Sequence, residues 1–256
     1  LHDALPIFAP AFSNFIGPFT AGLLIDHAGF QWAFAAMALL PVVAWICIRQ
    51  AHELSKVVKP EGHENNSAWD LLNEPMFRRL LMVNWFLSAC WDVHTFVVPI
   101  LGHERGLSAS AIGSILGAFA LAAAFIRMMM PFIAARLQEW QVVTGAMLIT
   151  SFMLAVYPFT ETAWLMGICS VLVGLSLGGV QPMIMSTLHQ ITPEHRHGEA
   201  LGLRLMGINA SSVLMPMVFG AAGTVIGISG VFWCVSAVVG LGSRSAYQLR
   251  VHKKSE

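Results

Sequence analysis

The sequence from Trp164 to Gly179 reads WLMGICSVLVGLSLGG and carries no charged side chain. The sequence from Val142 to Val156 is almost as apolar. A surface helix of a soluble protein shows a polar face along its length, whereas a helix that crosses a bilayer needs about 20 mostly apolar residues. Because these two stretches lack a polar face, they predict helices that span a membrane.

The whole chain has the composition of a membrane protein. Charged residues make up 11% of its 256 residues and hydrophobic residues 56%, whereas a soluble domain carries about 25% charged residues. Short polar breaks separate apolar runs of membrane length, so we predict an all-α, polytopic membrane helix bundle of about eight transmembrane helices. The predicted spans are Ile7–Ile25, Gln31–Ile48, Arg79–Leu101, Ala109–Ile133, Trp140–Pro158, Ala163–Leu188, Ala200–Ala221 and Val225–Leu241.

One long polar stretch, Arg49–Arg78, falls between the second and third spans and is interpreted as a linker between two bundles. Apolar residues near its end predict a short helix on the membrane surface. These residues are Trp69, Leu71, Leu72, Met76 and Phe77. The predicted division is the last two helices of a first bundle (1–49), the linker (50–78), a six-helix second bundle (79–246) and a tail (247–256).

Lys and Arg are distributed unequally between two sets of loops. The linker, the turn at Arg136, the loop at Arg196 and the tail hold most of them, and the opposite loops hold only Arg105. By the positive-inside rule, the linker and the C-terminus are expected in the cytoplasm. We expect an integral membrane protein, placed in the bacterial inner (plasma) membrane.

An internal repeat relates the first two spans to the last two. A shift of 198 positions superimposes five residue pairs, which are Ser13 with Ser211, Pro18 with Pro216, Gly22 with Gly220, Gly29 with Gly227 and Phe34 with Phe232. Chance similarity between membrane helices rich in Gly and Pro is the alternative. If the repeat is real, about four further spans of ~30 residues each belong to the first bundle. The chain is then a fragment whose partner is the missing N-terminal helices of the same protein.

The first span contains SNFIGPFTAG, which resembles the GxxxGPxxGG motif of proton-coupled exporters in the major facilitator superfamily. Asp26–Phe34 is similar to the family's turn into its sixth helix, and Gly198–Arg204 resembles the start of its eleventh. The turn Arg136–Trp140 departs from the family's loop rich in Gly, Asp and Arg, and Leu1–Pro6 matches nothing in it, so we predict that Leu1–Pro6 is partly foreign sequence. Small residues remain throughout the motif and preserve close helix packing. The candidate packing residues are Ser13, Gly17, Pro18, Ala21 and Gly22.

The third span carries the best candidate for an ion pathway. At 100° per residue, its polar residues form a single stripe that also includes a tryptophan and a proline. The stripe is Asn84, Ser88, Trp91, Asp92, Thr95 and Pro99. A carboxylate inside a membrane helix is costly, so Asp92 is interpreted as a group that carries a proton or binds a cation. The alternative is that Asp92 reaches headgroup water. His94 points about 160° away from Asp92, and we expect a structural position for it.

Charged residues near the cytoplasmic ends of spans suggest a gate. On the fourth span, a stripe of small residues begins at Gly113 and ends in Arg127. Arg204 lies on the seventh span. We predict that these arginines pair with Glu139, Glu194 or Glu199 as the halves rock. The alternative is that both arginines extend to the lipid headgroups.

Amide side chains are the candidate contacts for a solute. Gln181 continues a stripe of small residues on the sixth span, and Asn209 lies on the seventh. An amide offers a donor and an acceptor to a polar solute, and hydrogen bonding between helices is the alternative for both residues.

Other chemistries find little support. The histidines His189, His195 and His197 flank one loop without an oriented carboxylate partner, so we predict no metal site. The zero net charge predicts no nucleic-acid partner, and no phosphate-binding loop or nucleophile elbow is present. We therefore expect neither an enzyme nor a cofactor.

The resemblance implies secondary active transport of a small solute by alternating access. We expect the coupling ion to be a proton, and the glycine-proline motif favours export. The partners would then be the lipid bilayer, a small-molecule substrate and the coupling ion. The alternative is a membrane sensor or scaffold that uses the same helical framework without transporting anything.

Overall fold

The computed structural model describes residues 5–49 and 67–250. Expectations for residues 1–4, 50–66 and 251–256, among them most of the linker and the foreign origin of the first residues, lie outside these ranges. Within them the chain forms helices and turns and contains no strand. The elements are α1 (Leu5–Ala28), α2 (Phe30–Arg49), the 3-10 helix η1 (Ala68–Asn73), α3 (Pro75–Asp92), the π-helical turn η2 (Val93–Val97), α4 (Val98–Glu104), α5 (Ala109–Ala134), α6 (Glu139–Val156), η3 (Tyr157–Phe159), α7 (Ala163–Gly178), α8 (Val180–Ile191), η4 (Glu194–Arg196) and α9 (His197–Tyr247).

Six helical segments among the described residues are long and apolar enough to cross a membrane. The last of them includes α9, which is broken at Gly227 and therefore contains two helices. The six segments therefore contain seven helical spans. Helix α1, which packs along α5, is the eighth, so the structure matches the eight predicted spans. The prediction of an all-α membrane bundle is confirmed. The six segments are Phe30–Arg49, Pro75–Glu104, Ala109–Ala134, Glu139–Phe159, Ala163–Ile191 and Glu194–Tyr247.

Two glycines that the repeat superimposes occupy equivalent turns. Gly29 joins α1 to α2 with a φ of 83°, and Gly227 joins the two parts of α9 with a φ of 73°. Residues with a side chain rarely adopt a positive φ, so glycine suits both turns. The similarity between the ends of the chain therefore extends to the backbone of the turn.

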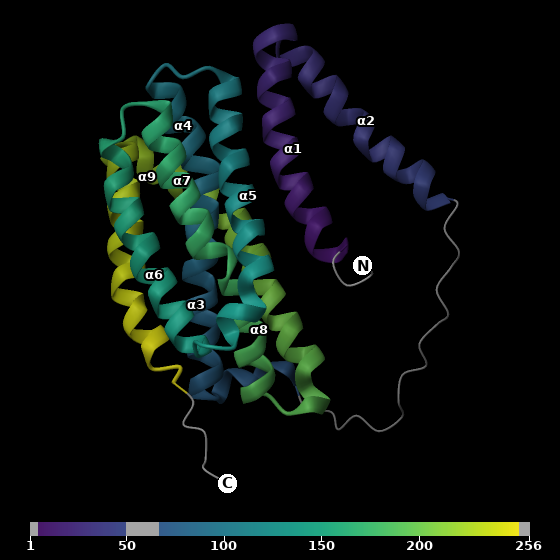
Figure 1. Ribbon diagram of the computed structural model, residues 1–256. Coiled ribbons are helices and arrows are strands. Elements are labelled where there is room, and N and C mark those ends of the chain that lie inside the picture. Colours follow the sequence, from purple (N-terminus) through teal and green to yellow (C-terminus); the bar gives the residue numbers. More distant parts are fainter. Residues whose placement is uncertain (1–4, 50–66, 251–256) are drawn as a thin grey trace.

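Helix α5 lies between α1 on one side and α7 on the other (Figure 1). On the α1 side, a Cβ atom added to Gly113 would collide with the carbonyl oxygen of Pro18, and one added to Gly22 would collide with that of Ala109. These two glycines therefore let the backbones of α1 and α5 touch. Of the other candidate packing residues, Ser13 is exposed, Ala21 is half-buried, and Gly17 has open space where its Cβ would be.

The remaining helices complete the bundle around α9. Helix α9 packs against both α3 and α6. Ser236 of α9 donates its hydroxyl to the carbonyl oxygen of Ser151 at 2.7 Å, and Ser151 donates to that of Ser236 at 2.8 Å. Helix α2 contacts α1 and then diverges from the bundle (Figure 1). Most of its apolar side chains are exposed, including Phe34 at 72% and Ile48 at 70%.

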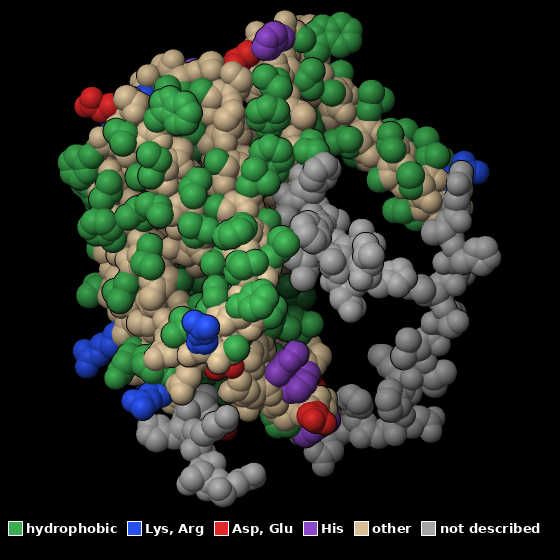
Figure 2. Space-filling model, viewed as in Figure 1, with side chains coloured by type: hydrophobic (Ala, Val, Ile, Leu, Met, Phe, Trp, Pro, Cys, Tyr) green, Lys and Arg blue, Asp and Glu red, His purple; other side chains and the backbone are tan. Residues whose placement is uncertain are grey.

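The ends of the bundle collect the polar side chains. One end of the bundle, which we call the linker end, holds two such contacts. Arg196 donates to the Ser67 carbonyl oxygen, and Trp140 packs on Tyr247. The α1–α2 turn, the α4–α5 loop and the α6–α7 loop meet at the other end, which we call the far end (Figure 1). Figure 2 shows hydrophobic side chains over the middle of the bundle and most charged ones toward its ends. This distribution suits a bundle that spans a membrane.

Two local predictions need correction. The predicted surface helix is the 3-10 helix Ala68–Asn73, in which Leu71 is buried and Trp69 exposed, but Met76 and Phe77 belong to α3. Pro75 occupies the first turn of α3, where its missing N–H costs nothing, so the chain turns into the bundle one residue before Met76. The third span is also not a uniform α-helix, because η2 interrupts it at Val93–Val97.

Candidate functional site

Asp92 ends α3 with its carboxylate inside the bundle, where the residue is 8% exposed. From α9, Ser211 donates its hydroxyl to Asp92 Oδ2 at 2.7 Å, and Ser212 donates to Oδ1 at 3.4 Å. Among the described residues, no basic side chain forms an ion pair with Asp92. A carboxylate with hydroxyl partners and no counter-ion is suited to accept a proton or a small cation.

Two more polar side chains follow the Asp92 face of α3. Asn84 and Ser88 lie two turns and one turn before Asp92, and they are 1% and 6% exposed. Asn84 Oδ1 and Ser88 Oγ have no hydrogen-bond partner among the described residues. Because buried polar atoms normally have a partner, these two oxygens are sites for a water molecule, an ion or a polar solute. The three side chains form what we call the α3 polar row.

The π-helical turn η2 changes which side chains share this row. A π turn forms i→i+5 hydrogen bonds and holds more residues than an α turn, so side chains after Asp92 rotate away from the α-helical position. Thr95 is exposed and donates its hydroxyl to the Trp91 carbonyl oxygen at 3.0 Å. Trp91 is half-buried and contacts Phe119 of α5, with 4.6 Å between ring centroids. Asn84, Ser88 and Asp92 thus form one buried row, and the wider six-residue stripe stays a prediction.

His94 belongs to a separate buried cluster that joins η2, η3, α5 and α7. Ser170 Oγ lies 2.8 Å from His94 Nε2 and 2.6 Å from the Tyr157 hydroxyl, which also donates to the Met166 carbonyl oxygen at 3.1 Å. The His94 ring stacks on Phe119 with 3.9 Å between centroids. The sequence predicted a structural position away from Asp92 but contained no signal for these partners, which come from other helices.

Arg127 lies in α5 and points toward the bend between α7 and α8. Its Nε donates to the Gly178 carbonyl oxygen at 3.2 Å, and its guanidinium carbon lies 5.8 Å from the centroid of the Trp91 ring. These contacts are with a backbone oxygen and an aromatic face. The pairing of Arg127 with a glutamate as the halves rock stays a prediction.

Arg204 and Gln181 contact each other between α9 and α8. Arg204 is 6% exposed and donates through Nη2 to Gln181 Oε1. Its Nε has no partner among the described residues, and the pairing of Arg204 with a glutamate as the halves rock also stays a prediction. Asn209 is exposed, and its Nδ2 donates to the Leu205 carbonyl oxygen at 2.9 Å within the same helix. Of the two predicted amide contacts, Gln181 thus joins two helices and Asn209 does not.

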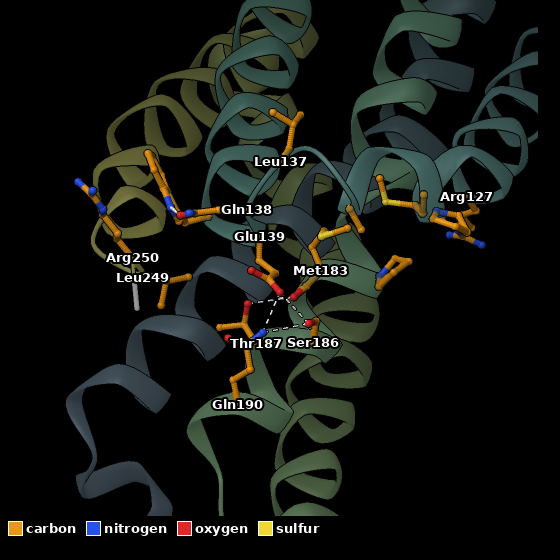
Figure 3. Close-up of a pocket in the computed structure, with 15 residues that line it drawn as sticks. Arg127, Leu137, Gln138, Glu139, Met183, Ser186, Thr187, Gln190, Leu249 and Arg250 are labelled. Atoms are coloured by element: carbon orange, nitrogen blue, oxygen red, sulfur yellow. Dashed lines mark hydrogen bonds between the residues drawn. The ribbon is translucent and has the colours of Figure 1, made fainter. Parts of the chain in front are cut away.

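A cavity of about 840 Å³ opens at the linker end between α5, α6 and α8 (Figure 3). Glu139 lies in its wall, where its Oε1 accepts hydrogen bonds from Ser186 at 2.9 Å and from Gln190 at 2.7 Å. Arg127 and Arg250 lie on opposite sides of the cavity (Figure 3). The predicted gate residues thus have other partners here: Glu139 accepts from α8, and Glu199 pairs with Arg196 at 2.8 Å.

Asp26 forms a contact at the far end that the sequence did not predict. Its two carboxylate oxygens accept backbone N–H bonds from Ala109 at 3.0 Å and from Ser110 at 2.7 Å. Hydrogen bonds from Ser110, by its side chain and its backbone, lower the pKa of Asp26 below its ordinary value. The carboxylate also faces the positive N-terminus of α5. The acidic residue after the first span was the available signal.

The histidines of the α8–α9 loop have partners within the protein. His189 and His197 stack with 4.6 Å between ring centroids, and His197 Nε2 lies 2.9 Å from the Thr192 carbonyl oxygen. His195 is exposed. Among the described residues, no group of three or more His, Cys, Asp or Glu side chains could hold a metal ion.

Comparison with known proteins agrees with the geometry. The sequence profile of the Major Facilitator Superfamily matches residues 9–216, which include both helices of the α1–α5 contact and the α3 polar row. No curated protein matches the chain. A bundle of membrane-length helices with buried polar residues and a profile match over most of its length places this chain in the Major Facilitator Superfamily, a family of transporters that move small solutes across membranes.

Proposed function

We propose that this protein is a secondary active transporter that exports a small solute in exchange for protons. Asp92 would be the group that takes up and releases the proton. The observation that carries this proposal is a buried carboxylate without a counter-ion among the described residues, held by Ser211 and preceded along α3 by two buried oxygens without described protein partners. A proton or a small cation would neutralise the carboxylate, and the free oxygens could hydrate the ion or contact the solute.

The same proposal gives the linker end a cytoplasmic location and adds four further helices to the first bundle. The excess of Lys and Arg in the loops at the linker end supports this orientation. The repeat over 198 residues supports the extra helices, and so does α2, which meets only α1 closely among the described elements. In alternating access, α1 would then carry the movement of the first bundle to α5.

The proposal is tested with the protein from the intact reading frame, reconstituted in lipid vesicles that carry a pH gradient. Efflux of a lipophilic cationic dye, together with a pH-sensitive dye for proton flux, reports coupled transport. Asp92→Asn should abolish dye accumulation against its gradient and the proton flux that accompanies it. The matched control is Asp70→Asn, because Asp70 is exposed on η1 and should keep both fluxes.

Two outcomes would contradict the proposal. Unchanged rate and unchanged pH dependence in Asp92→Asn would remove Asp92 from the mechanism. Absence of flux in the unmodified protein, for this dye and for neutral and anionic solutes, would favour a sensor or scaffold on the same framework.

A further inference from the structure

The bend between α7 and α8 lacks one backbone hydrogen bond by covalent necessity. Helix α7 ends at Gly178 and α8 begins at Val180, with Pro182 in its first turn. In a continuous α-helix, the N–H of residue 182 would donate to the carbonyl oxygen of residue 178. Proline has no N–H, so the Gly178 oxygen loses the donor that the helix would otherwise provide.

A side chain from another helix donates to that oxygen. Arg127 of α5 reaches the Gly178 carbonyl oxygen through Nε at 3.2 Å. Gly178 is the last residue of α7, so the guanidinium also lies at the negative end of the α7 helix dipole. The Trp91 ring, 5.8 Å from the guanidinium carbon, adds a cation–π contact. These contacts favour the charged side chain at this bend over an extended position toward the lipid headgroups.

The contact depends on close approach of two backbones. A Cβ atom added to Gly178 would collide with the Ala123 carbonyl oxygen and the Ile126 side chain, both on α5. A Cβ atom added to Gly174 would collide with the Phe119 carbonyl oxygen. Only with glycine at these positions does α7 lie near enough for Arg127 to reach the end of the helix.

We propose that Arg127 is a positioning residue that replaces the backbone donor missing at Pro182 and thereby ties α5 to the bend between α7 and α8. Helix α8 forms one wall of the cavity at the linker end, to which Pro182, Met183 and Ser186 contribute. The angle at the bend therefore sets the position of this wall relative to α5 (Figure 3). The role in transport rests on the proposed function, whereas the structural role does not.

The test is a double-mutant cycle in the protein from the intact reading frame. Arg127→Met removes the donor and keeps a long apolar stem, and Pro182→Ala restores a backbone N–H opposite the Gly178 oxygen. The cycle compares both single variants with the double variant. Pro41→Ala, which removes a proline from the interior of α2, is the matched control in place of Pro182→Ala. Thermal unfolding and dye efflux are measured on each variant.

Arg127→Met should lower the midpoint of thermal unfolding by about 3–8 °C, the shift expected for loss of one charge-assisted hydrogen bond in a protein of this size. It should also reduce efflux about tenfold, if the same free energy acts on the gating equilibrium. The double variant with Pro182→Ala should recover to within about 2 °C of Pro182→Ala alone and regain most of the efflux. The double variant with Pro41→Ala should remain as impaired as Arg127→Met.

Each other outcome overturns a stated part of the proposal. If Pro182→Ala does not restore the thermal stability of Arg127→Met, Arg127 does not act through the Gly178 oxygen. If stability returns without efflux, Arg127 contacts the solute or the ion directly and its positioning role in transport is wrong. If the unmodified protein shows no efflux, the proposed function fails, while the unfolding midpoints still decide whether Arg127 replaces the missing donor.

Discussion

Ser170 is the side chain whose removal should most clearly expose the energetics of the bundle interior. It is fully buried, and its hydroxyl is the partner of both His94 Nε2 and the Tyr157 hydroxyl. His94 Nδ1 already has no partner among the described residues, so Ser170→Ala would leave the buried imidazole without any hydrogen bond. The Tyr157 hydroxyl would keep its bond to the Met166 carbonyl oxygen.

The magnitude follows from these contacts. Hydrogen bonds between membrane helices contribute about 0.6 kcal/mol on average, and a buried polar group without a partner costs about 1–3 kcal/mol. We therefore expect Ser170→Ala to lower the free energy of unfolding by about 2–3 kcal/mol. In a protein of this size the unfolding midpoint should fall by roughly 4–10 °C.

The assay is thermal unfolding in lipid nanodiscs, followed by tryptophan fluorescence. The matched control is Ser176→Ala, because Ser176 is on the same helix but only half-buried, and its hydroxyl donates to the Leu172 carbonyl oxygen one turn earlier. This control should change the midpoint by no more than about 1 °C. Equal midpoints for the two variants would refute the reasoning, because the buried cluster would then add nothing beyond a local helix contact.

Two further predictions concern the contact between α1 and α5. Because hydrogen bonds from Ser110 lower the pKa of Asp26, this contact should be complete above the ordinary carboxyl pKa of about 4 and weaken as the pH falls through the lowered value. Electron paramagnetic resonance distances between spin labels at the far ends of α1 and α5 should therefore lengthen in acid, whereas Asp26→Asn should show the longer distance even at pH 7; a distance that does not depend on pH would argue against the Asp26 contact. Gly113→Ala should destabilise the protein by about 1–3 kcal/mol through collision with the Pro18 carbonyl oxygen, whereas Gly145→Ala, with open space around it, should stabilise it by roughly 0.5–1 kcal/mol. Midpoints that move in the same direction would show that the two glycines do not differ in packing.

Sequence patterns predicted helices more reliably than helix faces. The spans from Ala109 and from Ala163 begin in the structure at those same residues, where the preceding Ser108 and Thr162 accept a backbone N–H in the first turn. In contrast, the stripe that begins at Asn84 was projected past Asp92 with α-helical geometry. The π turn that follows Asp92 is not encoded in the hydrophobic pattern, because a membrane helix is apolar on most of its faces.

The contacts of the gate residues were also not predictable from sequence patterns. Arg127 and Glu139 were paired because they have opposite charges near the same end of the bundle. The structure directs Arg127 to a backbone oxygen at a proline bend and Glu139 to hydroxyl and amide groups of α8. Matching opposite charges does not identify a carbonyl oxygen that lacks a hydrogen-bond donor. Pro182, which has no N–H, was the sequence signal for such an oxygen at Gly178.

The amino-acid sequence by itself determined that this chain forms membrane-length helices, roughly where most of them lie, and to which family it belongs. Hydrophobic length, helix caps and glycine turns act over a few neighbouring residues and are therefore readable along the chain. Only the tertiary structure decided that Asp92 meets Ser211, that His94 meets Ser170 and that Arg127 meets Gly178. These contacts join residues 119, 76 and 51 positions apart, and they depend on helix rotation and on how closely glycines let the backbones approach.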